Sequence, residues 1–266
     1  MNEVTGHGKM VGKHGNPQHK KDECHENRTQ SNLLKSKDLI ILGGLNKMEF
    51  HRIDLDSWKR KPYFDHYLNQ VRCTFSMTAN IDITELRVLL REKGVKLYPA
   101  FLYMVTKAVN AHPEFRTTYD AEGHLGYWKR MLPSYTFFHQ DDQTFSTMWT
   151  DFSDDFCLFY ENYTADMKTY GDNKGIVAKE MEPPYTFPVS CIPWVSFTGF
   201  NLNIFNDGRY LLPIITSGKY FEQEGRTLLP VSLQVHHAVC DGYHASLFLT
   251  DLQKWTTDCK DWLIVR

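Results

Sequence analysis

Two histidines and an aspartate lie close together near the carboxyl end of the chain, in the run His-His-Ala-Val-Cys-Asp-Gly at 236–242. The preceding residues, 231–236, alternate between apolar and polar side chains, which predicts a half-buried β-strand. Asp241 and Gly242 predict a tight turn into a helix that Asp241 caps. A strand–loop–helix junction can hold an imidazole rigidly, and a neutral imidazole suits general-base catalysis of acyl transfer. His237, where the chain changes direction, is therefore the candidate base.

The same residue types have other interpretations. A histidine near a strand end is often a packed core residue, and Asp241 could serve only as a helix cap. Asp241 could also orient the ring of His237, as the carboxylate of a catalytic triad does. His244, one helical turn later, could join His236 and Asp241 around a metal ion. The residue types alone leave these alternatives open.

The composition limits the partners of the chain. Its 266 residues are 42% hydrophobic and 14% aromatic, with a formal net charge of −2. This balance gives no electrostatic reason to expect nucleic acid or a membrane surface as a partner. No apolar run approaches the roughly 20 residues that span a bilayer, so we expect a cytoplasmic protein. The six cysteines form no C-x-x-C pair and are expected to be free thiols.

Composition changes sharply near Met48. Residues 1–47 contain no aromatic residue, and they carry eight Lys or Arg against five Asp or Glu. A polar segment of this kind buries too little surface to offset the entropy lost on ordering. We therefore expect a disordered N-terminal extension at 1–47, whose histidines match no zinc spacing, and a single catalytic domain at 48–266.

Helical and strand patterns interleave along residues 48–266. Apolar spacing, caps and proline or glycine stops predict helices at 58–68, 82–93, 99–112, 154–170 and 243–255. Alternation and β-branched or aromatic enrichment predict strands at 74–81, 125–128, 135–139, 144–150, 186–192, 200–205, 210–220 and 227–236. Strands and hairpins mixed with helices indicate an α/β chain, more closely an α+β two-layer sandwich with helices packed on a mixed sheet.

The motif H-H-x-x-x-D-G is typical of the CoA-dependent acyltransferases related to chloramphenicol acetyltransferase. The chain resembles the trimeric chloramphenicol acetyltransferase family from residue 48 to 263, in order and without a large gap. The resemblance also rests on Trp58-Lys59-Arg60-Lys61, Phe64-Asp65-His66-Tyr67, Cys73-Thr74-Phe75-Ser76-Met77-Thr78, Glu114-Phe115-Arg116-Thr117, Gly126-Tyr127, Thr144-Phe145-Ser146, Ser190-Cys191-Ile192-Pro193-Trp194 and Gly199-Phe200-Asn201-Leu202-Asn203.

The resemblance implies an enzyme that moves the acetyl group of acetyl-CoA to the primary hydroxyl of chloramphenicol and so confers resistance. It implies that His237 is the general base and that Ser190 stabilises the tetrahedral oxyanion. Asp241 would then pair with Arg60 in a structural role. No metal or prosthetic group is implied.

Further positions carry over from the family. The acceptor site would involve Tyr67, Cys73, Phe75, Phe145, Phe200, Leu202 and Thr216, the last through a bound water. Trp194 and Tyr220 would lie beside CoA. The family implies a homotrimer with active sites between subunits. Two alternatives stay open: the catalytic core of a dihydrolipoamide acyltransferase, and a non-catalytic antibiotic-binding protein of the same fold.

Overall fold

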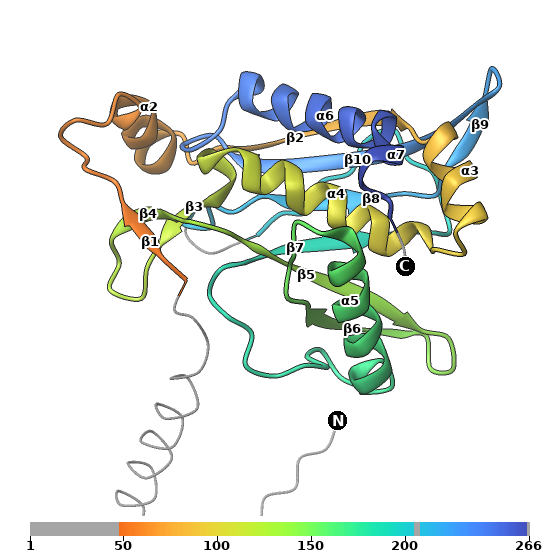
Figure 1. Cartoon of the computed structure of the whole chain (residues 1–266). Helices are drawn as coiled ribbons and strands as arrows, with labels where there is room; N and C mark the ends of the chain where they lie inside the picture. The colour runs from red at the N-terminus through yellow and green to blue at the C-terminus, as the bar shows by residue number, and fades with distance from the viewer. Residues whose placement is uncertain (1–47, 205–207, 265–266) are drawn as a thin grey trace, which may run out of the picture. The chain divides into compact units, whose positions relative to one another are not determined.

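The computed structural model describes residues 48–204 and 208–264. The expectation of disorder at 1–47 lies outside these residues. Met48–Arg266 forms one compact unit, drawn in colour in Figure 1. Within the described part of the chain, no helix is long and apolar enough to cross a membrane.

A seven-stranded mixed sheet forms the centre of this unit. Its main path runs β2-β10-β8-β7-β5-β6, and β9 pairs with the start of β10. The contacts of β7 with β5 and with β8 are parallel, whereas the other contacts are antiparallel. Its strands are β2 (Thr74–Asp82), β5 (Leu132–His139), β6 (Thr144–Trp149), β7 (Thr186–Cys191), β8 (Ile214–Ser217), β9 (Phe221–Gln223) and β10 (Arg226–His236). A separate three-stranded sheet has the order β1-β4-β3, with β1 (Phe50–Arg52), β3 (Thr117–Tyr119) and β4 (Leu125–Trp128).

Helices pack on the large sheet, with α6 beside β2 and against α4 (Figure 1). The α-helices are α2 (Lys61–Asp65), α3 (Thr84–Glu92), α4 (Leu97–Ala111), α5 (Phe156–Tyr170), α6 (Gly242–Thr257) and α7 (Cys259–Trp262). Helix α4 ends before Pro113 because a residue that precedes proline disfavours helical backbone angles. Helix α6 begins at its cap Asp241, as predicted, and the carboxylate accepts hydrogen bonds from two backbone N–H groups of the first turn.

Strand β10 is buried on both faces, so the prediction of a half-buried strand is wrong. Its apolar residues, such as Leu233, join the core with Phe248 of α6. The polar residues Ser232 and Gln234, on the opposite face, are also buried because the irregular segment 199–204 lies against them. The predicted mixed sheet with packed helices is nevertheless confirmed.

Several predicted boundaries were wrong for local reasons. Residues 200–204 form no strand, and within 210–220 only Ile214–Ser217 does. The helix predicted at 58–68 begins only at Lys61, after a turn in which the Ser57 hydroxyl donates to Asp54. It continues as a π-helical turn at His66–Gln70. The short strands β1, β3 and β9 were not predicted.

Candidate active site

His237 directly follows β10, and three neighbours fix its ring and backbone. The imidazole stacks on Tyr67, with ring centroids 3.8 Å apart and planes 4° apart. Phe75 meets it edge-on at 5.2 Å, and the backbone N–H of His237 donates to the carbonyl of Cys73 at 2.9 Å. Nδ1 is buried, so an outside group can reach the ring only through Nε2. This nitrogen is therefore the atom available for proton transfer.

Arg60 clamps the turn that carries His237. Its guanidinium donates to the carbonyl oxygens of His237, at 3.1 Å, and Ala238, at 3.0 Å. The same group donates to Asp241 Oδ2 at 2.9 Å. One arginine from the start of α2 thus binds three acceptors between residues 237 and 241, and this holds the turn in a single shape.

Asp241 bonds Arg60, His244 and the start of α6, and no bond joins it to His237 within the described residues. Partial burial alone would raise the pKa of Asp241, but the hydrogen bond from Arg60 and the neighbouring positive charges outweigh it and lower the pKa to about 2. The geometry therefore favours a supporting role over the triad interpretation.

The possible metal cluster of His236, Asp241 and His244 is not assembled. The buried His236 accepts a hydrogen bond from the Ala238 N–H through Nδ1, and burial lowers its pKa. His244 instead bonds Asp241 and lies near Glu114. In the described part of the chain, the one group with ligand-like spacing is on the β3–β4 turn, where Arg52 already pairs with both carboxylates; it comprises Asp120, Glu122 and His124.

A second set of predicted residues lines a cavity of about 530 Å³. Six of them, taken from β6, β7, β8 and the segment after β7, are Phe145, Ser190, Trp194, Phe200, Leu202 and Thr216. The walls are mostly apolar, and aromatic rings among them suit a flat aromatic ligand. Ser190 lies beside Thr216 in the parallel pairing of β7 with β8.

The register separates this cavity from His237 of the same chain. Thr216 pairs with Ser190 on one side and with Ser232 on the other, and His237 comes five residues after Ser232. At roughly 3.4 Å per residue and 4.8 Å per strand, His237 and Ser190 are about 20 Å apart. Two groups this far apart cannot act on one reacting carbonyl. The predicted site therefore falls into two halves, a base half with Tyr67, Cys73, Phe75 and His237, and a cavity half with Ser190.

Tyr220 lines a neighbouring cavity of about 230 Å³ and lies under the guanidinium of Arg87 at 4.4 Å. Tyr98, Cys191 and Pro193 line both this cavity and the one at Ser190. The two cavities are therefore adjacent. Trp194 lines the cavity at Ser190 and Tyr220 lines its neighbour, on either side of the wall that the two cavities share.

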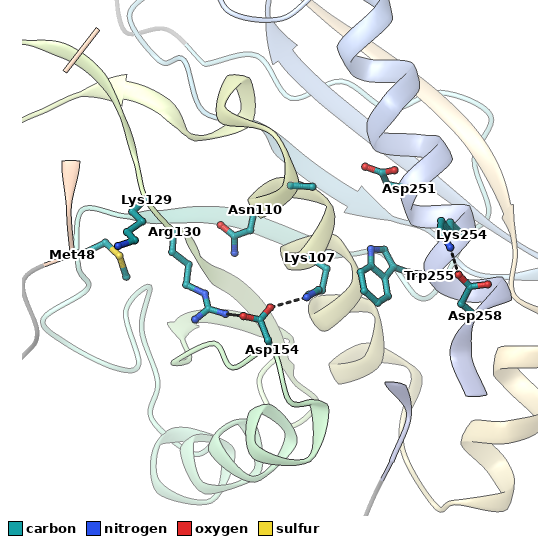
Figure 2. A pocket seen from close by; sticks show the side chains of 11 residues that line it. Met48, Lys107, Asn110, Lys129, Arg130, Asp154, Asp251, Lys254, Trp255 and Asp258 are labelled. Carbon is teal, nitrogen blue, oxygen red and sulfur yellow. Dashed lines mark hydrogen bonds and ion pairs between the residues drawn. The ribbon is translucent and has the colours of Figure 1, made fainter. Parts of the chain in front are cut away.

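A larger cavity, about 720 Å³, lies elsewhere and contains none of the predicted site residues (Figure 2). Its charged groups are already paired: Lys107 and Arg130 both bind Asp154, and Lys254 binds Asp258. The other two charged residues of the lining are also paired, Lys129 with Glu49 and Asp251 with His112. Trp255 is stacked under Lys107. These pairings leave no unmatched reactive group, so the cavity does not compete with the predicted site.

Three residues near the cavity half were missed from the sequence. Tyr98 forms part of both hollows and donates to the carbonyl of Thr136 at 2.9 Å. Ser232 and Gln234 bond the backbone of the segment that carries Phe200 and Leu202. The sequence carried a signal for Ser232 and Gln234, because polar residues inside a central strand need buried hydrogen-bond partners.

Comparison with known proteins places the chain among its relatives. It matches the chloramphenicol acetyltransferase family over residues 48–253. A chloramphenicol acetyltransferase of Clostridium perfringens is 55% identical over 216 residues, which cover 81% of this chain and 99% of that protein. One from Clostridium butyricum is 53% identical with the same coverage. The chain belongs to the chloramphenicol acetyltransferase family.

Solved structures agree on the fold of this family member. A chloramphenicol acetyltransferase structure matches with a TM-score of 0.70 at 22% identity, and the match covers 78% of this chain and 100% of that one. A dihydrolipoamide acetyltransferase of Azotobacter vinelandii matches with a TM-score of 0.53 at 20% identity, over 72% and 84% of the two chains. The predicted family, enzyme class and fold are therefore confirmed.

Loss of the Arg60 clamp is expected to destabilise this acetyltransferase. Arg60→Met removes three hydrogen bonds and leaves Asp241 without its ion pair. The Arg60 side chain is 15% exposed and that of Asp241 38% exposed, so solvent moderates the loss. We expect the free energy of unfolding to fall by about 2–4 kcal/mol. Urea denaturation at fixed protein concentration and pH 7 measures it.

The control for this prediction is Arg52→Met, which breaks the pairs with Asp120 and Glu122. The Arg52 side chain is 55% exposed, so the loss should cost less than about 1 kcal/mol. The pKa of Asp241 is lowered in the fold, so the ion pair stabilises fully above the ordinary value of 3.8 and loses its effect as pH falls toward 2. The difference between wild type and Arg60→Met should therefore shrink between about pH 4 and 2. Equal costs for both variants at pH 7 would contradict the clamp.

Proposed function

We propose that the chain transfers the acetyl group of acetyl-CoA to the primary hydroxyl of chloramphenicol and thereby inactivates the antibiotic. The observation that carries this proposal is the identity of 53–55% with chloramphenicol acetyltransferases, across 99% of their length. The family uses acetyl-CoA as co-substrate. The cavity beside Ser190 supports a flat aromatic acceptor, because several of its walls are aromatic rings.

In the proposed reaction, His237 Nε2 removes the proton of the attacking hydroxyl while the oxygen forms a bond to the thioester carbonyl. The carbonyl becomes an oxyanion, and the Ser190 hydroxyl donates a hydrogen bond to it. Collapse of the intermediate breaks the carbon–sulfur bond. The imidazolium then returns its proton to the departing sulfur, which leaves the acetyl ester, free CoA thiol and neutral His237.

The two halves of the site meet between different copies of the chain in this proposal. His237 of one copy faces the Ser190 cavity of the next, since about 20 Å separates these residues within one chain. Exposed apolar side chains near the cavity support a covered surface there; they are Phe145 (51% exposed), Trp194 (58%), Val195 (56%), Leu202 (46%) and Ile204 (42%). Closure of such a head-to-tail contact around a threefold axis gives a homotrimer.

The purified chain is expected to release CoA thiol from acetyl-CoA only when chloramphenicol is present. A thiol-reactive dye follows the release, and mass spectrometry identifies the monoacetylated product. Its expression in a sensitive bacterium should raise the inhibitory concentration of chloramphenicol. Thiol release without product, or equal release without the acceptor, would reject the proposal. The likeness to the dihydrolipoamide acetyltransferase is one of fold alone, so dihydrolipoamide serves as the negative-control acceptor. Mass spectrometry follows this control, because dihydrolipoamide carries thiols of its own that react with the dye.

A further inference from the structure

The segment 199–204 forms a wall of the acceptor cavity and yet belongs to no helix or strand. It carries Phe200 and Leu202, both of which line the cavity. Backbone without secondary structure must satisfy its N–H and C=O groups in another way when it lies against a buried surface. The partners that it finds determine where these two side chains lie.

Two polar side chains of β10 supply those partners. The Ser232 hydroxyl donates to the Phe200 carbonyl at 2.7 Å. Gln234 uses both ends of its amide on one residue: Oε1 accepts from the Leu202 N–H at 2.8 Å, and Nε2 donates to the Leu202 carbonyl. Ser76 donates to the same Oε1 at 3.3 Å. Gln234 is 7% exposed and Ser232 2%, so water cannot readily replace these bonds.

We propose that Gln234 is the positioning residue that sets the acceptor cavity, because its amide holds Leu202, and with it the segment 199–204, as a neighbouring strand would. This inference rests on the proposed function, since it assigns the cavity to the acceptor. The amide of glutamine donates to the carbonyl through Nε2 and accepts from the N–H of the same residue through Oε1. Glutamate has nearly the same shape but no donor when ionised, so it would repel the Leu202 carbonyl.

The chain contains a matched control for the pair of hydrogen bonds between Gln234 and Leu202. Gln253 of α6 makes the same pair of bonds with Asp82, accepting from its N–H at 2.9 Å and donating to its carbonyl at 3.0 Å. Asp82 is the last residue of β2, and neither residue lines the acceptor cavity. Gln253→Glu therefore removes an equivalent donor at a place where the acceptor is not bound.

The test compares the steady-state kinetics of full-length wild type, Gln234→Glu and Gln253→Glu. Gln234→Glu should raise the KM for chloramphenicol about 10-fold or more, the effect of losing one buried hydrogen bond. The KM for acetyl-CoA and kcat should change less than about threefold, because His237 and Ser190 keep their own supports. Gln253→Glu should leave all three values near wild type. If Gln234→Glu misfolds, Ser232→Ala, which removes only the bond to Phe200, should raise the same KM by a smaller factor.

Amide hydrogen exchange provides a readout that needs no activity. Exchange in a peptide covering 199–204 should speed up in Gln234→Glu and stay at the wild-type rate in Gln253→Glu. Unchanged exchange there, or an unchanged KM for chloramphenicol in an active enzyme, overturns the role of Gln234. An equal rise of that KM in Gln253→Glu also overturns it. A wild type without chloramphenicol-dependent thiol release overturns the proposed function instead, and the exchange experiment still decides whether Gln234 holds the segment.

Discussion

Replacement of His237 with alanine is expected to lower the kcat for chloramphenicol acetylation about 10²–10⁴-fold, because a well-placed general base contributes a factor of this size. The hydroxyl of the acceptor ionises only far above neutral pH, so its attack on a thioester depends on removal of the proton. The ring of His237 is fixed by the stack on Tyr67, and its Nδ1 is buried, which leaves Nε2 as the nitrogen available to the acceptor. No other described side chain of the base half offers a neutral acceptor for that proton.

Acceptor binding separates loss of the base from loss of the fold. His237→Ala should still bind chloramphenicol with nearly wild-type affinity in a calorimetric titration. The cavity is lined by Tyr98, by residues of β5–β8 and by the segments 192–194 and 199–204, and not by His237 of the same chain. Tyr67→Phe keeps the stacked ring and loses only a hydroxyl, so it should retain most activity. Full turnover by His237→Ala would end the assignment of His237 as the base.

Local sequence patterns predicted those parts of the fold whose hydrogen bonds are local. Strand β4 and helix α6 agree closely with their predicted ranges, and Asp241 caps α6 as its position after the motif indicated. A strand was predicted at 200–205 because its apolar and polar residues alternate, and residue 205 lies outside the described residues. The segment 200–204 forms no strand. Its backbone is instead bonded by the side chains of Ser232 and Gln234. Such long-range partners leave no trace in the local pattern.

The residues of the site also divide into those that a local motif predicted and those that it did not. The motif at 236–242 was sufficient to predict His237 as the candidate base. Arg60 lies 177 residues away in sequence from the carbonyl that it binds, so only the family resemblance predicted its role. Spacing could not separate the triad interpretation of Asp241 from an ion pair, because the choice depends on where α2 packs. The split into two halves follows from the strand order, with β8 between β10 and β7. Sequence motifs name residues but do not give that order.

Mixed oligomers of two inactive variants are expected to recover activity. Ser190→Ala removes the proposed oxyanion donor and should lower kcat about 10²–10³-fold on its own. In the proposed trimers, formed from equal amounts of His237→Ala and Ser190→Ala chains, each site would take its base from one copy and its serine from the next. Random assembly gives both intact residues to about one quarter of the sites. Activity should therefore rise to about one quarter of the wild-type value, far above either variant alone.

The mixture separates two arrangements that single variants cannot distinguish. If His237 and Ser190 of one chain served the same site, every chain in the mixture would lack one of them, and no site would recover. Chains with different affinity tags, unfolded and refolded together, allow the mixed species to be isolated before thiol release is measured. One of the three sites in each isolated mixed trimer has both residues intact, so its activity should be about one third of the wild-type value. His237→Ala mixed with His237→Gln is the control and should stay inactive. Within one chain, the strand register places the two residues about 20 Å apart. Recovery is therefore expected only if His237 of one chain lies beside Ser190 of another.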